Sequence, residues 1–328
     1  MAAPFLDLRD RIDRHIEAVV DSCPYPASLY DPIRYVMRMG GKRVRPLLVV
    51  LAARSLGAQD EQLPDEGQVL DLAVAVELLH TFTLVHDDIM DRDDMRRGQP
   101  TIHARWDEGT AILAGDALIG LAYRCLCRQD GPRLGEMIRT FTDAVVEVCE
   151  GQALDKEFEG RGDVGLREYE EMIARKTGRL ISMSARLGAL AADGDAAQVD
   201  ALESYGARLG KAFQIQDDLL DYFSSTQELG KAVGSDLVMH KATYATLKGR
   251  LLLQGDEAAR LEALLRQGSS DSVAEIRRLL EQGGVPEAGR RDVETLAQQA
   301  RADLAAVLPA ARIHDLELFS DWILRRTY

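Results

Sequence analysis

The sequence has few cysteines, prolines and aromatic residues, and each shortage excludes a class of protein. Four cysteines in 328 residues are too few for a disulfide scaffold, and their spacings fit neither a zinc site nor a redox pair. We expect Cys23, Cys125, Cys127 and Cys149 to be small buried side chains in a reducing cytosol. Ten prolines and 5% aromatic residues, in a chain rich in Ala, Leu, Glu and Arg, favour helices over strands. We therefore expect an all-α fold.

The sequence also lacks an excess of positive charge and a long apolar run. Its net charge of -14 at pH 7 argues against nucleic-acid binding. No run of about twenty apolar residues and no signal-peptide pattern occurs, so we expect a cytoplasmic protein without stable membrane insertion. No Pro/Gly/Ser-rich linker divides the chain, and we expect residues 1–328 to form a single domain.

The clearest functional motif comprises Asp87, Asp88 and Asp91 at the end of an apolar helical segment. Residues three and four apart on a helix are neighbours, so this spacing predicts that the three carboxylates converge. Converging like charges require a cation, and ligation by oxygen alone favours magnesium or manganese over zinc. A solvated acidic helix end is the alternative for a single cluster. The same spacing recurs in QDDLLD at Gln216–Asp221, which favours metal binding.

Basic residues lie near the first acidic motif. GGKRVRP at Gly40–Pro46 precedes an apolar helix, and glycines before a helix N-terminus, with basic side chains, predict a phosphate site. An ordinary basic turn is the alternative there. Arg96 and Arg97 follow the acidic motif and suit a diphosphate, unless they neutralise the aspartates directly. His80 lies two turns before Asp87 on the same helix face.

Further polar residues lie inside apolar helical segments downstream. Lys176 and Thr177 are candidates to face a cavity, although a surface lysine is the commoner alternative. Gln214 precedes Asp217 by three residues and therefore shares its helix face. Ser224–His240 contains several glycines and is suited to closing over a site.

Taken together, these motifs resemble the trans-isoprenyl diphosphate synthases of the polyprenyl synthetase family. The resemblance covers nearly the whole chain and rests, in order, on Gly40–Pro46, Asp87–Thr101, Gly151–Asp155, Lys176-Thr177, Gln216–Asp221 and Gly230-Lys231. It implies an isoprenoid synthase fold, with helices around a deep central cavity, and usually a homodimer. Ala232 replaces a common proline, and the residues around Lys241 depart from the family pattern, which leaves the role of that lysine open.

The resemblance also implies a reaction. Isopentenyl diphosphate would be condensed with dimethylallyl, geranyl or farnesyl diphosphate, and about three Mg²⁺ ions, or Mn²⁺, would stabilise the departing diphosphate. The implied metal ligands are Asp87, Asp91 and Asp217, with Asp88, Asp218 and Asp221 in supporting positions. The implied ligands of the allylic diphosphate are Arg96, Lys176, Gln214, Lys231 and Lys241, and those of isopentenyl diphosphate are Lys42, Arg45, His80 and Arg97. Thr177 and Gln214 would stabilise the allylic cation.

Chain length is expected to depend on the residues one to two turns before the first aspartate. Phe82 and Thr83 stand five and four residues before Asp87. A bulky aromatic followed by a small residue resembles the geranylgeranyl (C20) producers of the family, whereas two aromatics resemble farnesyl producers. We expect a C20 product, with farnesyl or longer products as alternatives, unless Phe82 only packs in the core.

Three other classes of protein are alternatives to this reading. A terpene cyclase also has acidic metal motifs, but it needs no second diphosphate site of the kind predicted from Gly40–Pro46 and Arg97. A non-catalytic partner subunit usually loses one acidic motif, and both are intact here. A di-iron helical bundle requires Glu-x-x-His pairs, which neither motif contains.

Overall fold

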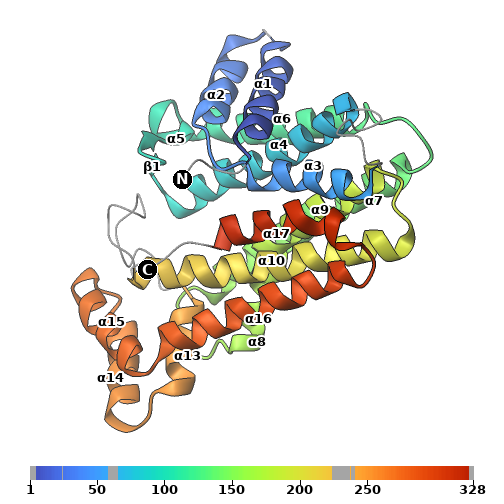
Figure 1. The fold of residues 1–328 in the computed structure, drawn as a ribbon. Coiled ribbons are helices and arrows are strands. Elements are labelled where there is room, and N and C mark those ends of the chain that lie inside the picture. The colour runs from blue at the N-terminus through green and yellow to red at the C-terminus, as the bar shows by residue number, and fades with distance from the viewer. Residues whose placement is uncertain (1–4, 24, 58–65, 224–236, 238–240, 325–328) are drawn as a thin grey trace. The chain divides into compact units, whose positions relative to one another are not determined.

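The structure, a computed structural model, describes residues 5–23, 25–57, 66–223, 237 and 241–324. Nearly all of its regular elements are helices (Figure 1), which confirms the all-α prediction. The first half of the chain forms α1 (Leu6–Asp21), α2 (Ala27–Arg38), α3 (Val44–Leu56), α4 (Glu66–Asp91), α5 (Ile102–Arg105), α6 (Glu108–Leu126) and α7 (Leu134–Phe158).

The second half continues with α8, a π-helical turn, α9 and α10, and ends in a set of shorter helices. The bounds are α8 (Leu166–Ile173), η1 (Ala174–Gly178), α9 (Arg179–Ala191), α10 (Ala196–Phe223), α13 (Tyr244–Leu252), α14 (Gly255–Gln267), the 3-10 turn η2 (Ser270–Ser272), α15 (Val273–Gln282), α16 (Val285–Ala305) and α17 (Ala310–Leu324).

The chain forms two compact units, which are described separately. Unit 1 comprises Met1–Val145, Met183–Glu203 and Val307–Phe319. Unit 2 comprises Val146–Ser182, Ser204–Ala306 and Ser320–Tyr328. The single domain over residues 1–328 stays a prediction.

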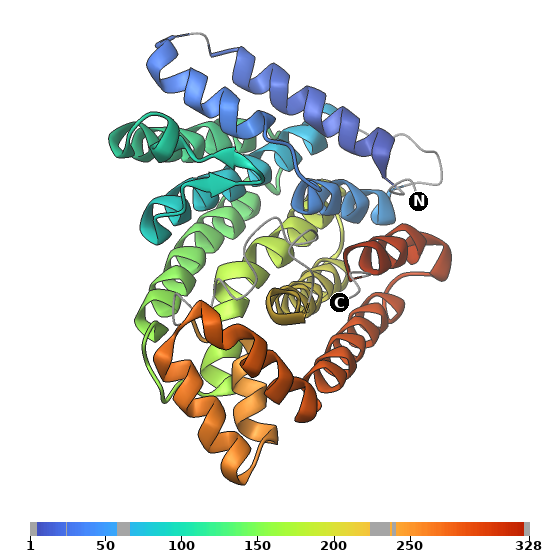
Figure 2. The ribbon, with the colours of Figure 1, turned by 90° about the vertical axis from the view of Figure 1, so that its left-hand side faces the viewer.

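Unit 1 is organised around α4, which packs against α3 and α6. Val74, Leu78 and Leu79 of α4 are completely buried, because this helix is apolar on all sides until its last turns. The neighbouring helices α1 and α2 lie side by side in both ribbon views (Figures 1 and 2). The acidic end of α4 is therefore held by a rigid apolar helix.

A two-stranded ribbon follows α4. Strand β1 (Met95–Arg96) pairs antiparallel with β2 (Gln99–Pro100). Arg97 and Gly98 connect the strands with positive φ angles of 52° and 73°, the backbone form of a tight two-residue hairpin turn. This ribbon, which the sequence analysis did not predict, fixes where Arg96 and Arg97 lie.

Unit 2 has its own core, in which Tyr169, Tyr222 and Tyr244 are buried. Helices α13, α14 and α15 pack on one another, and α13 and α15 also pack on α16 (Figure 2). Ile276, Leu279 and Leu280 of α15 are buried on the apolar face that the sequence pattern predicts.

Within the described residues, two helices are long and apolar enough, by length and composition, to cross a membrane. They lie within Gly67–Asp91 and Glu108–Leu126, although no uninterrupted apolar run marks them in the sequence. The apolar window of the first is 67% buried inside the protein and that of the second 44%. Core helices of globular proteins have the same composition, and both helices belong to the packed core of unit 1.

The prediction of four buried cysteines is half right. None of the four forms a disulfide; Cys23 and Cys125 are buried, but Cys127 and Cys149 are exposed. Cys127 follows the last residue of α6, and Cys149 lies on an outward-facing position of α7. Burial raises the pKa of the Cys125 thiol to about 11, so this side chain is an inert part of the core.

Candidate active site

The first acidic motif occupies the last turns of α4. Asp88 is buried, whereas Asp87 and Asp91 are partly exposed. Nε of Arg96 donates to Oδ1 of Asp88 at 2.7 Å. Burial opposes the charge of Arg96, but the Asp88 carboxylate outweighs it, and the pKa of the guanidinium is raised. Consecutive helical residues point about 100° apart, so Asp88 turns toward β1 and away from Asp87.

The prediction that the three carboxylates together bind a cation stays a prediction, although Asp88 is already paired with Arg96. Among the residues that the structure describes, no three His, Cys, Asp or Glu side chains lie close enough to hold a metal ion between them. Mg²⁺, however, is usually bound by one or two carboxylates, with water and substrate phosphates completing its ligands. The partly exposed Asp87 and Asp91, one helical turn apart, fit that requirement.

The glycine loop at Gly40–Pro46 meets the ribbon after α4. A guanidinium nitrogen of Arg97 donates to the carbonyl of Gly40. Gly41 has a φ of +146°, which favours glycine, and a Cβ there would lie 2.8 Å from Nη1 of Arg97, so a side chain would displace the guanidinium. Two motifs far apart in the sequence are thus joined, with the exposed Lys42 next to them.

One basic residue of this loop has a different task from the one its motif predicts. Arg43 is buried and lies 2.7 Å from Asp13 and 2.6 Å from Glu77. It also donates to the carbonyl of Met37 at 2.8 Å. Its charge is neutralised within the protein, so Arg43 anchors the loop and does not face a phosphate. An acidic Glu77 inside an apolar helix was the sequence signal for this partner.

Arg45 and His80 form the basic side of the loop. Nη1 of Arg45 lies 3.1 Å from Nε2 of His80, and since arginine has no acceptor, the histidine must accept. Burial lowers the pKa of Arg45 to about 10. Burial, and then the charges of Arg45 and Arg97, lower the pKa of His80 well below its usual value, so the ring is neutral at pH 7.

This basic cluster has unused hydrogen-bonding capacity. Nε of Arg45 and Nδ1 of His80 are buried and have no hydrogen-bond partner among the described residues. Besides burial, the positive charge of Arg97 lowers the pKa of Arg45, and the charges of Arg43 and Arg96 add to burial in lowering the pKa of Arg97. Such a cluster is stabilised by a bound anion, and a diphosphate suits several guanidinium groups at once.

The second acidic motif, on α10 of unit 2, is built like the first. Its middle residue, Asp218, is buried and accepts hydrogen bonds from Tyr169 at 2.6 Å, from Gln214 at 2.7 Å and from the backbone N–H of Tyr244 at 2.7 Å. Asp217 is exposed. In each motif the second aspartate accepts hydrogen bonds from the protein, and the first aspartate is at least partly exposed to solvent. Asp88 and Asp218 are the residues for which a supporting role is expected.

The structure brings Lys176 and Thr177 together with residues of two neighbouring helices. Nζ of Lys176 lies 2.6 Å from Oδ2 of Asp155 on α7, and Nζ of Lys241 lies 3.9 Å from the same oxygen. Thr177 donates to Oε1 of Gln214 on α10 at 2.7 Å. The family motif contained Asp155, but sequence reasoning did not place it in the site.

Three further polar residues of unit 2 bear on the candidate site. The amide of Gln152 is buried and its nitrogen and oxygen have no hydrogen-bond partner in the described part of the chain. Asp221 is also buried, in keeping with a supporting position. Lys231 lies outside the described residues, as does most of the predicted closing loop.

Of the two expected chain-length residues, Phe82 lies in the core of unit 1 and Thr83 is partly exposed. Phe82 is buried, and its ring packs edge to face on the imidazole of His86, with the two ring centroids 4.8 Å apart. The His86 ring fills space left by Gly115 of α6, where a Cβ would approach Cδ2 of the imidazole to 2.5 Å. Thr83 donates to the carbonyl of His80 within α4. The imidazole of His86 thus supports one side of the Phe82 ring.

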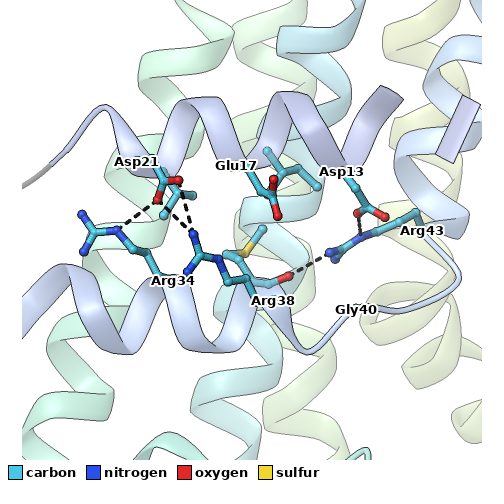
Figure 3. A pocket seen from close by; sticks show the side chains of 10 residues that line it. Asp13, Glu17, Asp21, Arg34, Arg38, Gly40 and Arg43 are labelled. Atoms are coloured by element: carbon cyan, nitrogen blue, oxygen red, sulfur yellow. Dashed lines mark hydrogen bonds and ion pairs between the residues drawn. The ribbon is translucent and has the colours of Figure 1, made fainter. Parts of the chain in front are cut away.

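A separate cavity of about 330 Å³ lies between α1 and α2 (Figure 3). Acidic residues of α1 face Arg34 and Arg38 of α2, and Asp21 pairs with Arg34 at 3.1 Å. This cavity shares only Gly40 and Arg43 with the glycine loop and contains none of the predicted ligands. It is not the candidate active site.

Comparison with known proteins bears on the identity of this arrangement. A family model described as polyprenyl synthetase matches residues 26–282, which include both acidic motifs and the glycine loop. The chain belongs to the polyprenyl synthetase family. Chain elongation by trans-prenyl transfer is the reaction of this family, and this polyprenyl synthetase is a trans-prenyltransferase.

Relatives of this polyprenyl synthetase differ in product. The chain is 40% identical to a geranylfarnesyl diphosphate synthase of Natronomonas pharaonis, covering 95% of this chain and 94% of that protein. It is 39% identical to a geranylgeranyl diphosphate synthase of Methanosarcina mazei, covering 80% and 84%. Similarity alone therefore leaves the product length open.

A solved structure supports the fold and the kind of ligands. The polyprenyl synthase of Caulobacter crescentus, complexed with calcium and isoprenyl diphosphate, matches with a TM-score of 0.87 and 29% identity over 99% of this chain and 97% of that one. The isoprenoid synthase fold is thus confirmed. The family acts on isoprenyl diphosphates and uses a divalent metal.

Proposed function

We propose that this polyprenyl synthetase condenses isopentenyl diphosphate head-to-tail with allylic diphosphates, with Mg²⁺, and releases geranylgeranyl diphosphate. The observation that carries the proposal is the contact of Arg97 with the glycine loop beside Arg45 and His80. This basic cluster contains no aspartate ligand for a metal, so it suits a second diphosphate. A terpene cyclase, which ionises a single diphosphate, does not need it.

In the proposed reaction, Lys42, Arg45, His80 and Arg97 bind isopentenyl diphosphate. Three cationic side chains balance the negative charge, and His80 stays neutral because burial, and then the charges of the neighbouring arginines, oppose its protonation. This binding orients the double bond of the substrate as the attacking group. Arg43 keeps the loop in place through Asp13 and Glu77.

Asp87, Asp91 and Asp217 are the proposed metal ligands. When bound, divalent ions neutralise the charge that develops on the allylic diphosphate as its carbon–oxygen bond breaks. Arg96 is paired with the carboxylate of Asp88, and Lys176 with that of Asp155. We assign both, together with Lys231 and Lys241, to the same diphosphate.

The hydroxyl of Thr177 and the amide of Gln214 are proposed to stabilise the allylic cation with their dipoles. The two side chains are already hydrogen-bonded to one another, so little reorganisation is needed. Apolar walls exclude water, which would quench the cation. The departing diphosphate accepts the proton, so no side chain has to serve as the general base.

The product length is assigned from Phe82. Its ring is buried and supported by His86, which in turn fills the space at Gly115. A supported aromatic ring is a firm floor for a growing apolar chain, because moving it would disturb a packed core. We therefore favour a C20 product over farnesyl or longer ones.

We also propose that two copies of the chain associate through α6. Ile112 and Leu113 of this helix are apolar, yet they are 42% and 61% exposed. They lie within a largely apolar stretch of the helix. A second copy that covers this face would remove apolar surface from water.

The four cysteines, none of which forms a disulfide, fit the reducing cytoplasm, where we place the enzyme.

The test is to incubate the purified protein with Mg²⁺, isopentenyl diphosphate and each allylic starter, and to measure product lengths by mass spectrometry. A C20 product supports both the proposed reaction and the assignment of Phe82 as the floor of the cavity. A C15 product or much longer chains support the reaction but not that role of Phe82. Conversion of one allylic diphosphate to a hydrocarbon, without isopentenyl diphosphate, would show a cyclase. No turnover would favour a partner subunit.

A further inference from the structure

The segment that carries Lys176 and Thr177 is not an ordinary helix. Residues Ala174–Gly178 form a π-helical turn between α8 and α9. Such turns are rare because they widen the helix and weaken its packing, and they occur frequently at functional sites. A widened turn needs support from its neighbours to persist.

Two glycines on neighbouring helices provide that support. A Cβ at Gly151 of α7 would lie 2.8 Å from the carbonyl carbon of Arg175 and from Cα of Lys176. A Cβ at Gly210 of α10 would lie 2.7 Å from Cα of Gly178. Real side chains do not approach backbone this closely, so both helices contact the turn only because these positions are glycine.

Each glycine is followed, four residues later, by a partner of the turn. Gly151 precedes Asp155, whose carboxylate holds Lys176 at 2.6 Å. Gly210 precedes Gln214, whose amide oxygen accepts from Thr177 at 2.7 Å. Because residues four apart share a helix face, the same face that makes the close approach also carries the partner.

We propose that Gly151 and Gly210 are positioning residues that set Lys176 and Thr177 for catalysis. The inference rests on the proposed function and extends it to two residues that touch neither substrate. Adding a methyl group at either glycine displaces the backbone of the turn, which moves the lysine off Asp155 or the threonine off Gln214. Displacements of about 1 Å in a catalytic group can cost about 100-fold in rate.

The experiment compares Gly151→Ala and Gly210→Ala with a matched control. A Cβ at Gly206, one turn earlier on α10, would lie 2.7 Å from Cα of Ser182, an equally tight contact outside the turn. We expect Gly151→Ala and Gly210→Ala to lower kcat about 100-fold with little change in the KM for isopentenyl diphosphate. Gly206→Ala should lower thermal stability comparably while keeping kcat near that of the wild type.

A double-variant cycle separates positioning from general damage. In a Thr177→Val background the hydroxyl is already lost, so Gly210→Ala should lower kcat only slightly further. If the two losses multiply, or if both glycine variants fold and keep the wild-type kcat, the inference is wrong. A loss in Gly206→Ala as large as in Gly210→Ala would also overturn it.

Partner variants keep the test decisive if an alanine variant does not fold. Asp155→Glu and Gln214→Asn shift the partners of the turn without touching the glycine contacts, and both should reproduce the loss in kcat. Wild-type kcat in both would refute the inference. A wild-type protein that extends no allylic starter refutes the proposed function itself, which is a different result from an active wild type with unaffected variants.

Discussion

Arg96 lies against the buried carboxylate of Asp88, with its Nε at 2.7 Å and its Nη2 at 2.6 Å from the same oxygen. The pair connects the end of α4 to strand β1. It neutralises one charge of the first acidic motif, so Asp87 and Asp91 can take a metal ion without a third uncompensated carboxylate beside them. In the proposed function, a substrate diphosphate would share the guanidinium with Asp88.

Removing this carboxylate should destabilise the protein. Asp88→Ala leaves the partly buried Arg96 guanidinium without its partner, and the free energy of unfolding should fall by about 3 kcal/mol. Urea denaturation measures the difference. Asp87→Ala, at the adjacent but partly exposed position, is the control and should cost much less. Equal losses in the two variants would contradict the structural role of the pair.

The metal assignment predicts a loss of turnover with the fold intact. Asp87→Ala or Asp217→Ala should lower kcat/KM about a thousandfold or more, because several kcal/mol of charge stabilisation are removed. Chelation of the metal should abolish turnover of the wild type, and added Mg²⁺ should restore it. The exposed Asp94 offers a control, since Asp94→Ala should keep activity. Normal turnover and metal dependence in Asp87→Ala would refute the assignment.

His80 predicts a dependence of stability on pH. Its pKa in the folded protein lies well below 6.5 because of burial and nearby arginines, whereas in the unfolded chain it is near 6.5. As the pH falls below about 6.5, the unfolded state takes up a proton that the folded state does not, so the free energy of unfolding decreases.

Urea denaturation at pH 8 and at pH 5.5 measures this contribution. His80→Gln has no titrating group at this position, so it should lose less stability than the wild type between the two pH values. All other groups are the same in the two proteins, so their contributions cancel in the comparison. An equal loss in both would show that His80 titrates normally in the folded state.

Phe82 predicts the product length. Phe82→Ala should lengthen the product beyond C20, because it removes the ring that forms the proposed floor, and should also cost about 3–5 kcal/mol of stability. The reciprocal variant Thr83→Phe adds a second aromatic and should shorten the product to C15. Mass spectrometry of extracted products measures both. An unchanged product distribution in both variants would place the floor elsewhere.

Much of the fold and part of the candidate site could be predicted from the sequence. Helical periodicity and the scarcity of strand formers identified the all-α class, because these are local properties of the chain. The acidic motifs and the glycine loop were recognisable because residue type and spacing along one segment decide which chemistry is possible. The choice of Asp87, Asp217 and Arg45 as candidate ligands follows from this local reading.

What the sequence did not reveal depended on contacts between distant segments. Spacing on a helix placed Asp88 with its neighbours, but a ribbon eight residues later draws it toward Arg96. Arg43 is part of a basic motif, yet its charge is neutralised by ion pairs with Asp13 and Glu77. Each side chain takes the partner that best offsets its desolvation, and that partner is known only once the chain is folded.

The sequence by itself determined the family, the class of reaction and the helices that carry the acidic motifs, because these depend on residue identity and local periodicity. Only the tertiary structure decided which charges are used inside the protein and which remain for a ligand. It also revealed the turn that Gly151 and Gly210 support. Close approach of backbones depends on how helices pack, and packing is a property of three-dimensional neighbours, which spacing along the chain does not specify.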